Sequence, residues 1–438
     1  MTKVLKFGGT SVGSAEKIKE VAQLIKNPDR KIVVLSAMAG TTNSLVEISN
    51  YLYKKNKDGA LEIINQLKRN YKEVIEELYS TDNYKEKAEA VINERFDYLK
   101  KFTKDTFTIV EEKDVLAQGE LMSTAMVNFY LQELGVKSEL LSAFDFMRTN
   151  NAGEPDSKFI KQNLENVLSK YPKTDLFITQ GFVCLNAYGE IDNLERGGSD
   201  YTASLIGAAI KADEIQIWTD IDGMHNNDPR YVENTKSIAH LSFDEAAELA
   251  YFGAKILHPT SVLPAKLANV PVRILNTNNP KAHGTLISGD QNHEGITAVA
   301  AKDGITAVRI RSGRMLLAYG FLRKVFEIFE NHKTPIDMIT TSEVSVSVTI
   351  DNDKHLDEIV DELMKFGTVE VDKEQVIVCV VGDLVRGNKG YANKIFEALE
   401  DIPLRMISYG GSDHNLSILI EEEYKKDTLQ ALSAKLFK

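Results

Sequence analysis

The residues best suited to chemistry lie near the N-terminus, where a lysine precedes a pair of glycines. The stretch Lys6–Thr10 follows a short apolar run, and a helical repeat begins at Ser14. A strand, a glycine turn and a helix in this order direct backbone N–H groups toward an anion such as phosphate. Lys6 adds a point charge beside that cradle. Because a glycine pair is also common in ordinary tight turns, the function depends on what accompanies it.

Further glycine-rich or charged stretches occur along the chain, and none is specific alone. The turn itself matches neither G-x-x-x-x-G-K-[ST] nor G-x-G-x-x-G. In Gln118–Thr124, one carboxylate follows a glycine, and we predict a helix start there, for which the ordinary explanation is a charge complementing the helix dipole. The others are Ser36–Asn43, Arg196–Thr202, Trp218–Gly223, Asp228–Arg230 and Phe252–Lys255.

Composition restricts the class of protein. The chain has 438 residues and a formal charge of −12, so it should hold at least two domains, and neither nucleic acid nor an anionic membrane is expected as its main partner. Its two cysteines, Cys184 and Cys379, lie in apolar segments and predict buried free thiols. We find no signal peptide or membrane-spanning run, and a cytoplasmic location is expected.

The first 290 residues predict an α/β domain. Buried strands alternate with helices, which favours an open, mostly parallel, doubly wound sheet. Residues 58–112 are long, charged and helical, and we interpret them as a helical insertion whose charges form a solvated face. The predicted strands are Val4–Phe7, Ile32–Leu35, Glu139–Leu141, Leu176–Thr179, Ile215–Thr219 and Val272–Leu275.

Residues 291–438 have a different pattern, with short strands and amphipathic helices in β-α-β-β order. The pattern occurs twice, at about 305–371 and 372–438, and predicts a divergent repeat of α+β ferredoxin-like modules. We expect a strand at 294–303 to complete the second module.

Taken together, the motifs resemble those of the aspartate kinases in the amino acid kinase family. They occur in the expected order over nearly the whole chain: Lys6–Ser11, Gln180–Phe182, Arg196–Asp200, Trp218–Asp220, Asp228–Arg230 and Phe252–Lys255. The resemblance implies an eight-stranded kinase domain and two ACT modules that bind amino-acid effectors. It also implies phosphorylation of the L-aspartate side chain by MgATP, as a step in lysine, threonine and methionine biosynthesis.

The resemblance also assigns roles to residues around the phosphates. The nucleophile is a carboxylate that is already ionised at pH 7, so no general base is needed, and the difficulty lies in bringing two anions together. Lys6, Asp200 and Lys255 are the implied catalytic residues, with Asp200 orienting the lysines. The ATP site would comprise Lys6, Gly8, Gly9, Thr10, Thr219, Asp220, His225, Arg230 and Lys255. Mg²⁺ would arrive with ATP, and no protein metal site is predicted.

The amino-acid substrate needs both a cation and an anion from the protein. Arg196 can grip a carboxylate through its forked guanidinium, and Glu120 can hold the α-ammonium. Ser36, Thr42 and Ser199 would add hydrogen bonds. Many relatives have Thr-Thr-Leu-Gly before the Arg-Gly-Gly, whereas this chain has Asp192-Asn193-Leu194-Glu195, which adds acids beside an anion site.

The first ACT module resembles that of lysine-sensitive aspartate kinases. Backbone amides at Gly320 suit an α-carboxylate, and Asp337 and Glu343 supply one negative charge for each ammonium of a diamino acid. Each acid alone could equally be a turn cap or a surface charge. The predicted effector residues are Met315, Ala318, Gly320, Phe321, Leu322, Asp337, Ser342 and Glu343. Since ACT modules pair, we expect a homodimer or a dimer of dimers.

Two alternative functions remain at this stage. One is a kinase of the same fold that acts on another small acid, such as glutamate, acetylglutamate or carbamate. The other is a catalytically silent amino-acid sensor, which should have lost Lys6, Asp200 or Lys255, although all three are present. A fused homoserine dehydrogenase is set aside, because no dinucleotide fingerprint occurs.

Overall fold

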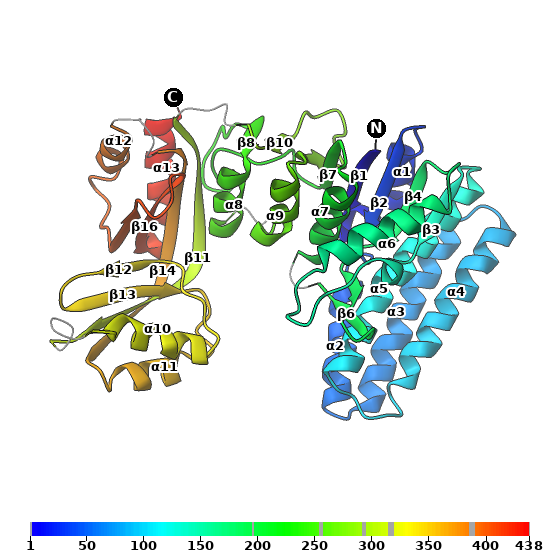
Figure 1. Cartoon of the computed structure of the whole chain (residues 1–438), viewed down its shortest axis with the longest axis horizontal. Coiled ribbons are helices and arrows are strands. Elements are labelled where there is room, and N and C mark those ends of the chain that lie inside the picture. Colours follow the sequence, from blue (N-terminus) through cyan, green and yellow to red (C-terminus); the bar gives the residue numbers. More distant parts are fainter. Residues whose placement is uncertain are drawn as a thin grey trace. The chain divides into compact units, whose positions relative to one another are not determined.

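The computed structural model describes residues 2–194, 197–253, 257–290, 295–313, 319–384 and 390–437. These residues form two compact units, coloured along the sequence in Figure 1. The first unit contains the described residues up to 224, residues 239–243 and residues 257–290. The second contains residues 225–238, the described residues from 244 to 253, and those from 295 onward. Two short segments before residue 290 therefore group with the C-terminal unit.

An eight-stranded sheet forms the centre of the first unit, counted over the described residues. The strand order is β3-β4-β2-β1-β7-β9-β10-β8, and all neighbours are parallel except β9 and β10. The doubly wound, mostly parallel sheet predicted from the sequence is thereby confirmed. The strands are β1 Thr2–Phe7, β2 Arg30–Leu35, β3 Ser138–Leu141, β4 Leu176–Gln180, β7 Glu214–Thr219, β8 His240–Ser242, β9 Val272–Asn276 and β10 Thr285–Ser288.

The central strands are buried, which explains their continuous apolar runs. Val4 and Phe7 of β1 are fully buried, as is Val33 of the adjacent β2. Helices cover a parallel sheet on both faces, so alternation with polar residues is lost. The helices are α1 Ala15–Ile25, α2 Thr41–Tyr53, α3 Lys57–Leu78, α4 Asp82–Lys101, α5 Ile109–Glu133, α6 Ser157–Ser169, α7 Gly198–Ile210 and α9 Pro259–Ala268, with a hairpin of β5 Val183–Leu185 and β6 Ile191–Asn193.

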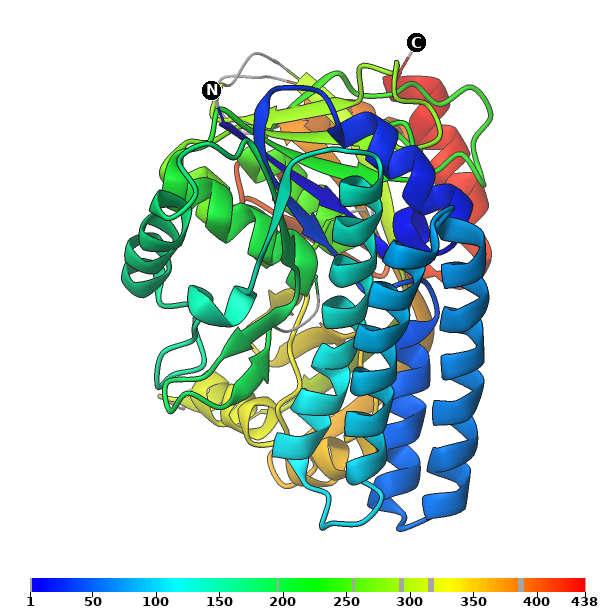
Figure 2. The same ribbon diagram turned by 90° about the vertical axis from the view of Figure 1, so that its right-hand side faces the viewer.

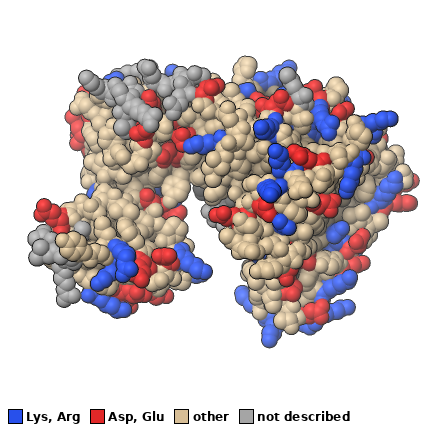
Figure 3. Space-filling model, viewed as in Figure 1, with Lys and Arg blue, Asp and Glu red and all other residues tan. Residues whose placement is uncertain are grey.

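The predicted helical insertion consists of α3, α4 and the first turns of α5, which stand beside α2 in Figure 2. One apolar stripe of α3, including Ile64, Leu67 and Tyr71, is buried in the core of the unit. Lys, Arg, Asp and Glu residues are mixed over the outer surface of these helices in Figure 3. This mixture fits a solvated face rather than a patch of one sign.

The prediction of a helix start at Gln118 is wrong. Helix α5 begins nine residues earlier, at Ile109, after a capping box in which Thr108 and Glu111 each satisfy the other's backbone N–H. Glu120 therefore lies in the middle of a long helix and is buried. Its charge does not complement a helix dipole, because the N-terminal turn is several turns away.

A six-stranded antiparallel sheet forms the centre of the second unit, again counted over described residues, in the order β12-β13-β11-β14-β16-β15. Four helices pack within this unit after β11, and α8 (Phe243–Phe252) joins it from residue 244. The bounds are β11 Gly295–Arg311, α10 Phe321–Asn331, β12 Ile339–Thr341, β13 Ser345–Ile350, α11 Leu356–Leu363, β14 Thr368–Asp383, α12 Tyr391–Ala398, β15 Met406–Tyr409, β16 Asn415–Glu421 and α13 Lys425–Leu436. Short 3₁₀ turns occur at Gly9–Val12 and Ala143–Asp145 in the first unit and at Glu422–Tyr424 in the second.

Two long strands, β11 and β14, run through both halves of this sheet. The first half of β11 pairs with the second half of β14, from Gly295 with Asp383 to Lys302 with Ile377. After irregular register near Ile305, the second half of β11 pairs with β13 and with the start of β14. Two separate hydrophobic clusters lie on the sheet, one for each repeat of the sequence pattern.

Candidate active site

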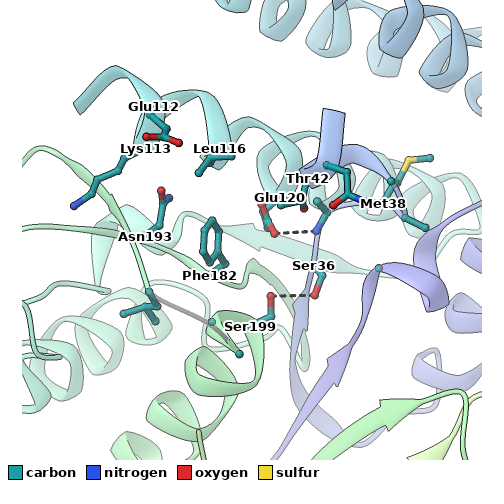
Figure 4. Close-up of a pocket in the computed structure, with 18 of the residues that line it drawn as sticks. Ser36, Met38, Thr42, Glu112, Lys113, Leu116, Glu120, Phe182, Asn193 and Ser199 are labelled. Atoms are coloured by element: carbon teal, nitrogen blue, oxygen red, sulfur yellow. Dashed lines mark hydrogen bonds between the residues drawn. The ribbon is translucent and has the colours of Figure 1, made fainter. Parts of the chain in front are cut away.

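A cavity of about 750 Å³ lies at the carboxyl ends of the parallel strands in the first unit. Its walls come from the segments that follow β1, β2 and β4, from α5, and from the start of α7. In open α/β sheets this edge is where ligands bind, since the loops there leave backbone and polar side chains exposed. Figure 4 shows the side chains around it.

Lys6 and Asp200 form an ion pair beside this cavity. Lys6 Nζ lies 2.7 Å from Asp200 Oδ1, and the two side chains are only 12% and 13% exposed. Lys6 comes from the end of β1, and Asp200 comes from the first turn of α7. The structure thus joins two motifs that are almost two hundred residues apart in the sequence.

The predicted order of strand, glycine turn and helix is present, with one difference. A 3₁₀ turn, Gly9–Val12, stands between β1 and α1, and α1 begins only after Ser14, whose side chain accepts a hydrogen bond from Lys17 N. Gly9 is required because a Cβ atom there would lie 2.9 Å from the carbonyl oxygen of Ala37. Gly9 and Thr10 line the cavity, and Gly8 precedes them.

Ser36, Thr42 and Ser199 line the same cavity. Ser36 Oγ donates to Ser199 Oγ at 3.0 Å, which connects the turn after β2 with the start of α7 (Figure 4). Thr42 is exposed toward the cavity, whereas the neighbouring Thr41 is buried and hydrogen bonds with Tyr71. The structure therefore brings Ser36, Thr42 and Ser199 together, and their roles toward a substrate stay predictions.

Glu120 is the buried acid of the pocket, at 5% exposure. Its Oε1 accepts a hydrogen bond from Ala37 N at 3.1 Å, drawn in Figure 4. No ion pair joins it to a cation among the described residues. Burial raises the pKa of the Glu120 carboxyl to about 8, and the Ala37 N–H only partly opposes this. An ammonium ion bound beside it would favour the ionised form.

Three wall residues, Lys113, Phe182 and Asn193, were absent from the sequence-based site. Lys113 Nζ lies 2.6 Å from Asp192 Oδ1, so the acid that departs from the family pattern is paired with a cation of α5. Phe182 has a positive φ of 68°, an uncommon conformation for a non-glycine residue and one that clusters at functional sites. The Gln-Gly-Phe motif pointed to Phe182, but no pattern pointed to Lys113.

The glycines before α7 explain part of the Arg-Gly-Gly motif. Gly197 has φ of 78°, and a Cβ atom there would lie 2.7 Å from His258 Cβ. A larger residue could therefore not begin α7 at this point. Arg196 itself lies outside the described residues, as does Lys255.

The predicted nucleotide residues divide between the units. Thr219 and Asp220 lie at the end of β7, at the same sheet edge as Lys6, and their side chains are 3.2 Å apart. His225 and Arg230 belong to the second unit, where His225 Nδ1 lies 2.8 Å from Thr235 Oγ1 and Arg230 binds both oxygens of Asp228. Their roles toward ATP stay predictions.

The predicted effector residues have different surroundings. Gly320, with φ of 81°, precedes α10; Phe321 is buried and Leu322 exposed. Ser342 and Glu343 lie in the exposed turn between β12 and β13, with Ser342 Oγ 2.7 Å from Ser345 Oγ. The Asp337 side chain is only 1% exposed and pairs with Lys302. Met315 and Ala318 lie outside the described residues.

No described group of three or more His, Cys, Asp or Glu side chains is arranged to hold a metal ion. None of the described helices is long and apolar enough to cross a membrane. Cys184 and Cys379 are both buried and free, and burial raises the pKa of each thiol, of Cys184 to about 12.

Comparison with known families agrees with this geometry. The profile of the Amino acid kinase family matches residues 1–276, and that of the ACT domain matches residues 378–436. The chain belongs to the amino acid kinase family.

The curated relatives are aspartokinases. Lysine-sensitive aspartokinase 3 of Escherichia coli is 34% identical, with 99% of each chain covered. Aspartokinase 3, chloroplastic, of Arabidopsis thaliana is 36% identical, covering all of this chain and 82% of the relative. The crystal structure of E. coli aspartokinase III in complex with aspartate and ADP (R-state) has a TM-score of 0.85 and 32% identity over the full length of both chains. The complex with lysine and aspartate (T-state) has a TM-score of 0.84 and 33% identity, again over both full lengths.

Proposed function

We propose that the chain transfers the γ-phosphoryl group of ATP to the side-chain carboxylate of L-aspartate. The product is 4-phospho-L-aspartate, and the reaction is the first step toward lysine, threonine and methionine. The observation that carries this proposal is a pocket lined by the buried acid Glu120, with the Lys6–Asp200 ion pair next to its lining residues Gly9 and Ser199. An acid suits the ammonium of an amino acid, and a lysine suits a phosphoryl group.

The chain's own residues contribute charge and position rather than a base. The substrate carboxylate is ionised at neutral pH and needs no proton acceptor. Lys6 lies where it can offset negative charge on the transferring phosphoryl group. Asp200 forms an ion pair with Lys6 and holds its ammonium at the end of β1. Asp200 is thus a positioning residue.

Substrate orientation follows from the two sides of the pocket. Glu120 would bind the α-ammonium of aspartate, because it is buried without a cationic partner among described residues. Ser36, Thr42 and Ser199 would donate short hydrogen bonds within the same cavity, and Arg196 would bind a carboxylate. On the nucleotide side we place Gly8–Thr10, Thr219, Asp220, His225, Arg230 and Lys255. Mg²⁺ would neutralise the phosphates and enter with ATP, held mainly by phosphate oxygens and water.

We further propose regulation by L-lysine at the first ACT module. Asp337 and Glu343 would bind its two ammonium groups, and the amides at the start of α10 would bind its carboxylate. Support comes from the buried position of Asp337 and from the E. coli relative, which is named lysine-sensitive and has been solved with lysine. A homodimer or dimer of dimers through the ACT modules, in the cytoplasm, completes the proposal.

The test is a coupled ADP assay with L-aspartate or L-glutamate, combined with hydroxylamine trapping of the acyl phosphate. We expect ADP formation that depends on aspartate, with at least about a hundredfold lower kcat/KM for glutamate. Equal use of glutamate, or no hydroxamate, would refute the substrate assignment. Titration of the same assay with L-lysine and L-threonine, alone and together, tests regulation separately.

A further inference from the structure

Helix α8 is attached to the sheet of the second unit by three side chains on one face. Glu245, Glu248 and Tyr251 are spaced three residues apart, so they project from the same side of the helix. Glu245 Oε1 accepts from Thr297 Oγ1 of β11, and Glu248 Oε2 accepts from Asn415 Nδ2 of β16, both at 2.6 Å. The third contact reaches the predicted effector residues.

Tyr251 donates its hydroxyl hydrogen to Asp337 Oδ1 at 2.6 Å. The same oxygen accepts from Lys302 Nζ at 2.8 Å, and this ammonium also lies 2.9 Å from Asp351 Oδ2. Lys302 Nζ is positioned over the Tyr251 ring, 4.3 Å from its centre. A lysine of the chain itself thus occupies one side of the acid that we assign to the effector.

The cluster retains capacity for one more cation. Asp337 and Asp351 together carry two negative charges, and Lys302 supplies one positive charge. Asp337 Oδ2 is buried and has no hydrogen-bond partner among the described residues. Burial also raises the pKa of Asp337, against the opposing effect of Lys302 and Tyr251. A buried acceptor without a donor is costly, so a further ammonium group would be favourable there.

The end of α8 is closely packed beside this cluster. Gly253 follows the helix with φ of 145°, and a Cβ atom there would lie 2.3 Å from the carbonyl oxygen of Ala301, next to Lys302. The backbone therefore touches β11 with no room for a side chain. In the sequence, Lys255 of the proposed ATP site follows Tyr251 by only four positions.

We propose that Tyr251 transmits occupancy of the effector site to the end of helix α8, at Phe252 and Gly253. An ammonium bound at Asp337 Oδ2 draws the carboxylate toward itself and weakens the hydrogen bond that Oδ1 accepts from Tyr251, and loss of that hydrogen bond releases the end of α8 from Asp337. Effector binding and the attached helix are then linked, because each biases the same contact. Tyr251 is a positioning residue, and the inference rests on the proposed regulation by lysine.

The test is Tyr251→Phe, which removes the hydroxyl but keeps the ring over Lys302. Because the hydrogen bond no longer opposes the effector, the lysine concentration for half-inhibition should fall about tenfold, as expected for one bond to a charged group. The KM for ATP should rise without lysine while that for aspartate stays unchanged. Hydrogen exchange of residues 243–252 should increase on adding lysine to the wild type and be already increased in the variant.

Asn415→Ala is the matched control, since it removes the middle contact of α8 without touching Asp337. Its half-inhibition by lysine should stay within about twofold of the wild type. An unchanged or weaker response of Tyr251→Phe to lysine, or an equal shift in Asn415→Ala, would overturn the role of Tyr251. If the wild type turns over aspartate but neither binds nor responds to lysine, the proposed regulation itself is overturned. The coupling role of Tyr251 is then overturned with it.

Discussion

The two compact units each contain a buried acid that the sequence assigned to a substrate or effector ammonium, and the two acids are held differently. Glu120 in the kinase unit accepts a hydrogen bond from the backbone N–H of Ala37 and has no cationic partner among the described residues. Asp337 in the regulatory unit already has Lys302 and the Tyr251 hydroxyl on one oxygen.

This difference separates a binding residue from a coupling residue. Glu120 has no charge partner in the described part of the chain, so its burial favours recognition of a cationic ligand at the expense of stability. Asp337 has a resident cation, so a ligand there must share or displace existing contacts and thereby change the surrounding structure. A buried acid that is already paired is better placed to transmit binding than one that is not.

The largest effect should come from breaking the Lys6–Asp200 ion pair of the kinase unit. Lys6→Ala removes the cation of the Lys6–Asp200 pair and should lower kcat by about a thousandfold, because charge on the phosphoryl group is no longer offset. Circular dichroism should show an intact fold. Lys17→Ala, which changes a half-exposed lysine on the following helix, is the control. A Lys6 variant with nearly normal kcat would remove this residue from the mechanism.

Next in size is the acid of the regulatory unit. Asp337→Asn removes the charge that the lysine ammonium requires, so half-inhibition should need roughly thirtyfold more lysine, with little change in the KM for aspartate. The measurement is an inhibition curve at fixed substrate. Asp353→Asn, an exposed acid of the same module, should respond normally to lysine. Full lysine sensitivity in Asp337→Asn would show that the effector binds elsewhere.

Glu120→Gln should have two opposite effects, weaker binding of aspartate and higher stability of the ligand-free fold. Losing the ammonium partner should raise the KM for aspartate about tenfold. The folded-state pKa of about 8 exceeds the ordinary value of 4.5, so folding stability should decline as pH rises between these two values. The ligand-free variant should therefore melt at a higher temperature than the wild type at pH 8, and by a smaller margin at pH 5. Equal melting temperatures at pH 8 would contradict the burial argument.

Glu112→Gln is the control for that experiment. Glu112 lies on the same helix and lines the same cavity, but it accepts a hydrogen bond from the Tyr53 hydroxyl and is only half-buried. Neither the KM for aspartate nor the pH dependence of melting should change in this variant.

The smallest effect concerns the cavity wall. Lys113→Met leaves Asp192 unpaired beside an anionic substrate and should raise the KM for aspartate about threefold, with kcat unchanged. Adding Asp192→Asn should restore the KM, because the unpaired charge is gone. An unaltered KM in the single variant would mean that Lys113 and Asp192 form only a surface ion pair.

The sequence predicted most of the kinase sheet because its strands are buried on both faces. Continuous apolar runs such as Ile32–Leu35 mark these strands with little ambiguity, and the predicted ends agree within one residue for β3, β4, β7 and β9. Short strands such as β8, β10 and the β5–β6 hairpin were missed, because three or four residues carry too little periodicity. Ordered motifs identified Lys6, Asp200, Ser36, Thr42, Glu120 and Ser199 before any coordinates, although their catalytic and binding roles stay predictions.

What the sequence by itself determined was therefore the chemistry available and the two-part organisation of the chain, since residue type and apolar spacing are local properties. Only the tertiary structure decided which charges meet. Lys6 reaches Asp200 because β1 and α7 end at one sheet edge, and Glu120 is buried because α5 starts earlier than its glycine implied. Tyr251, Lys302 and Asp337 converge from α8, β11 and the segment before β12. Contacts between residues so far apart depend on strand order and register, which no local pattern specifies.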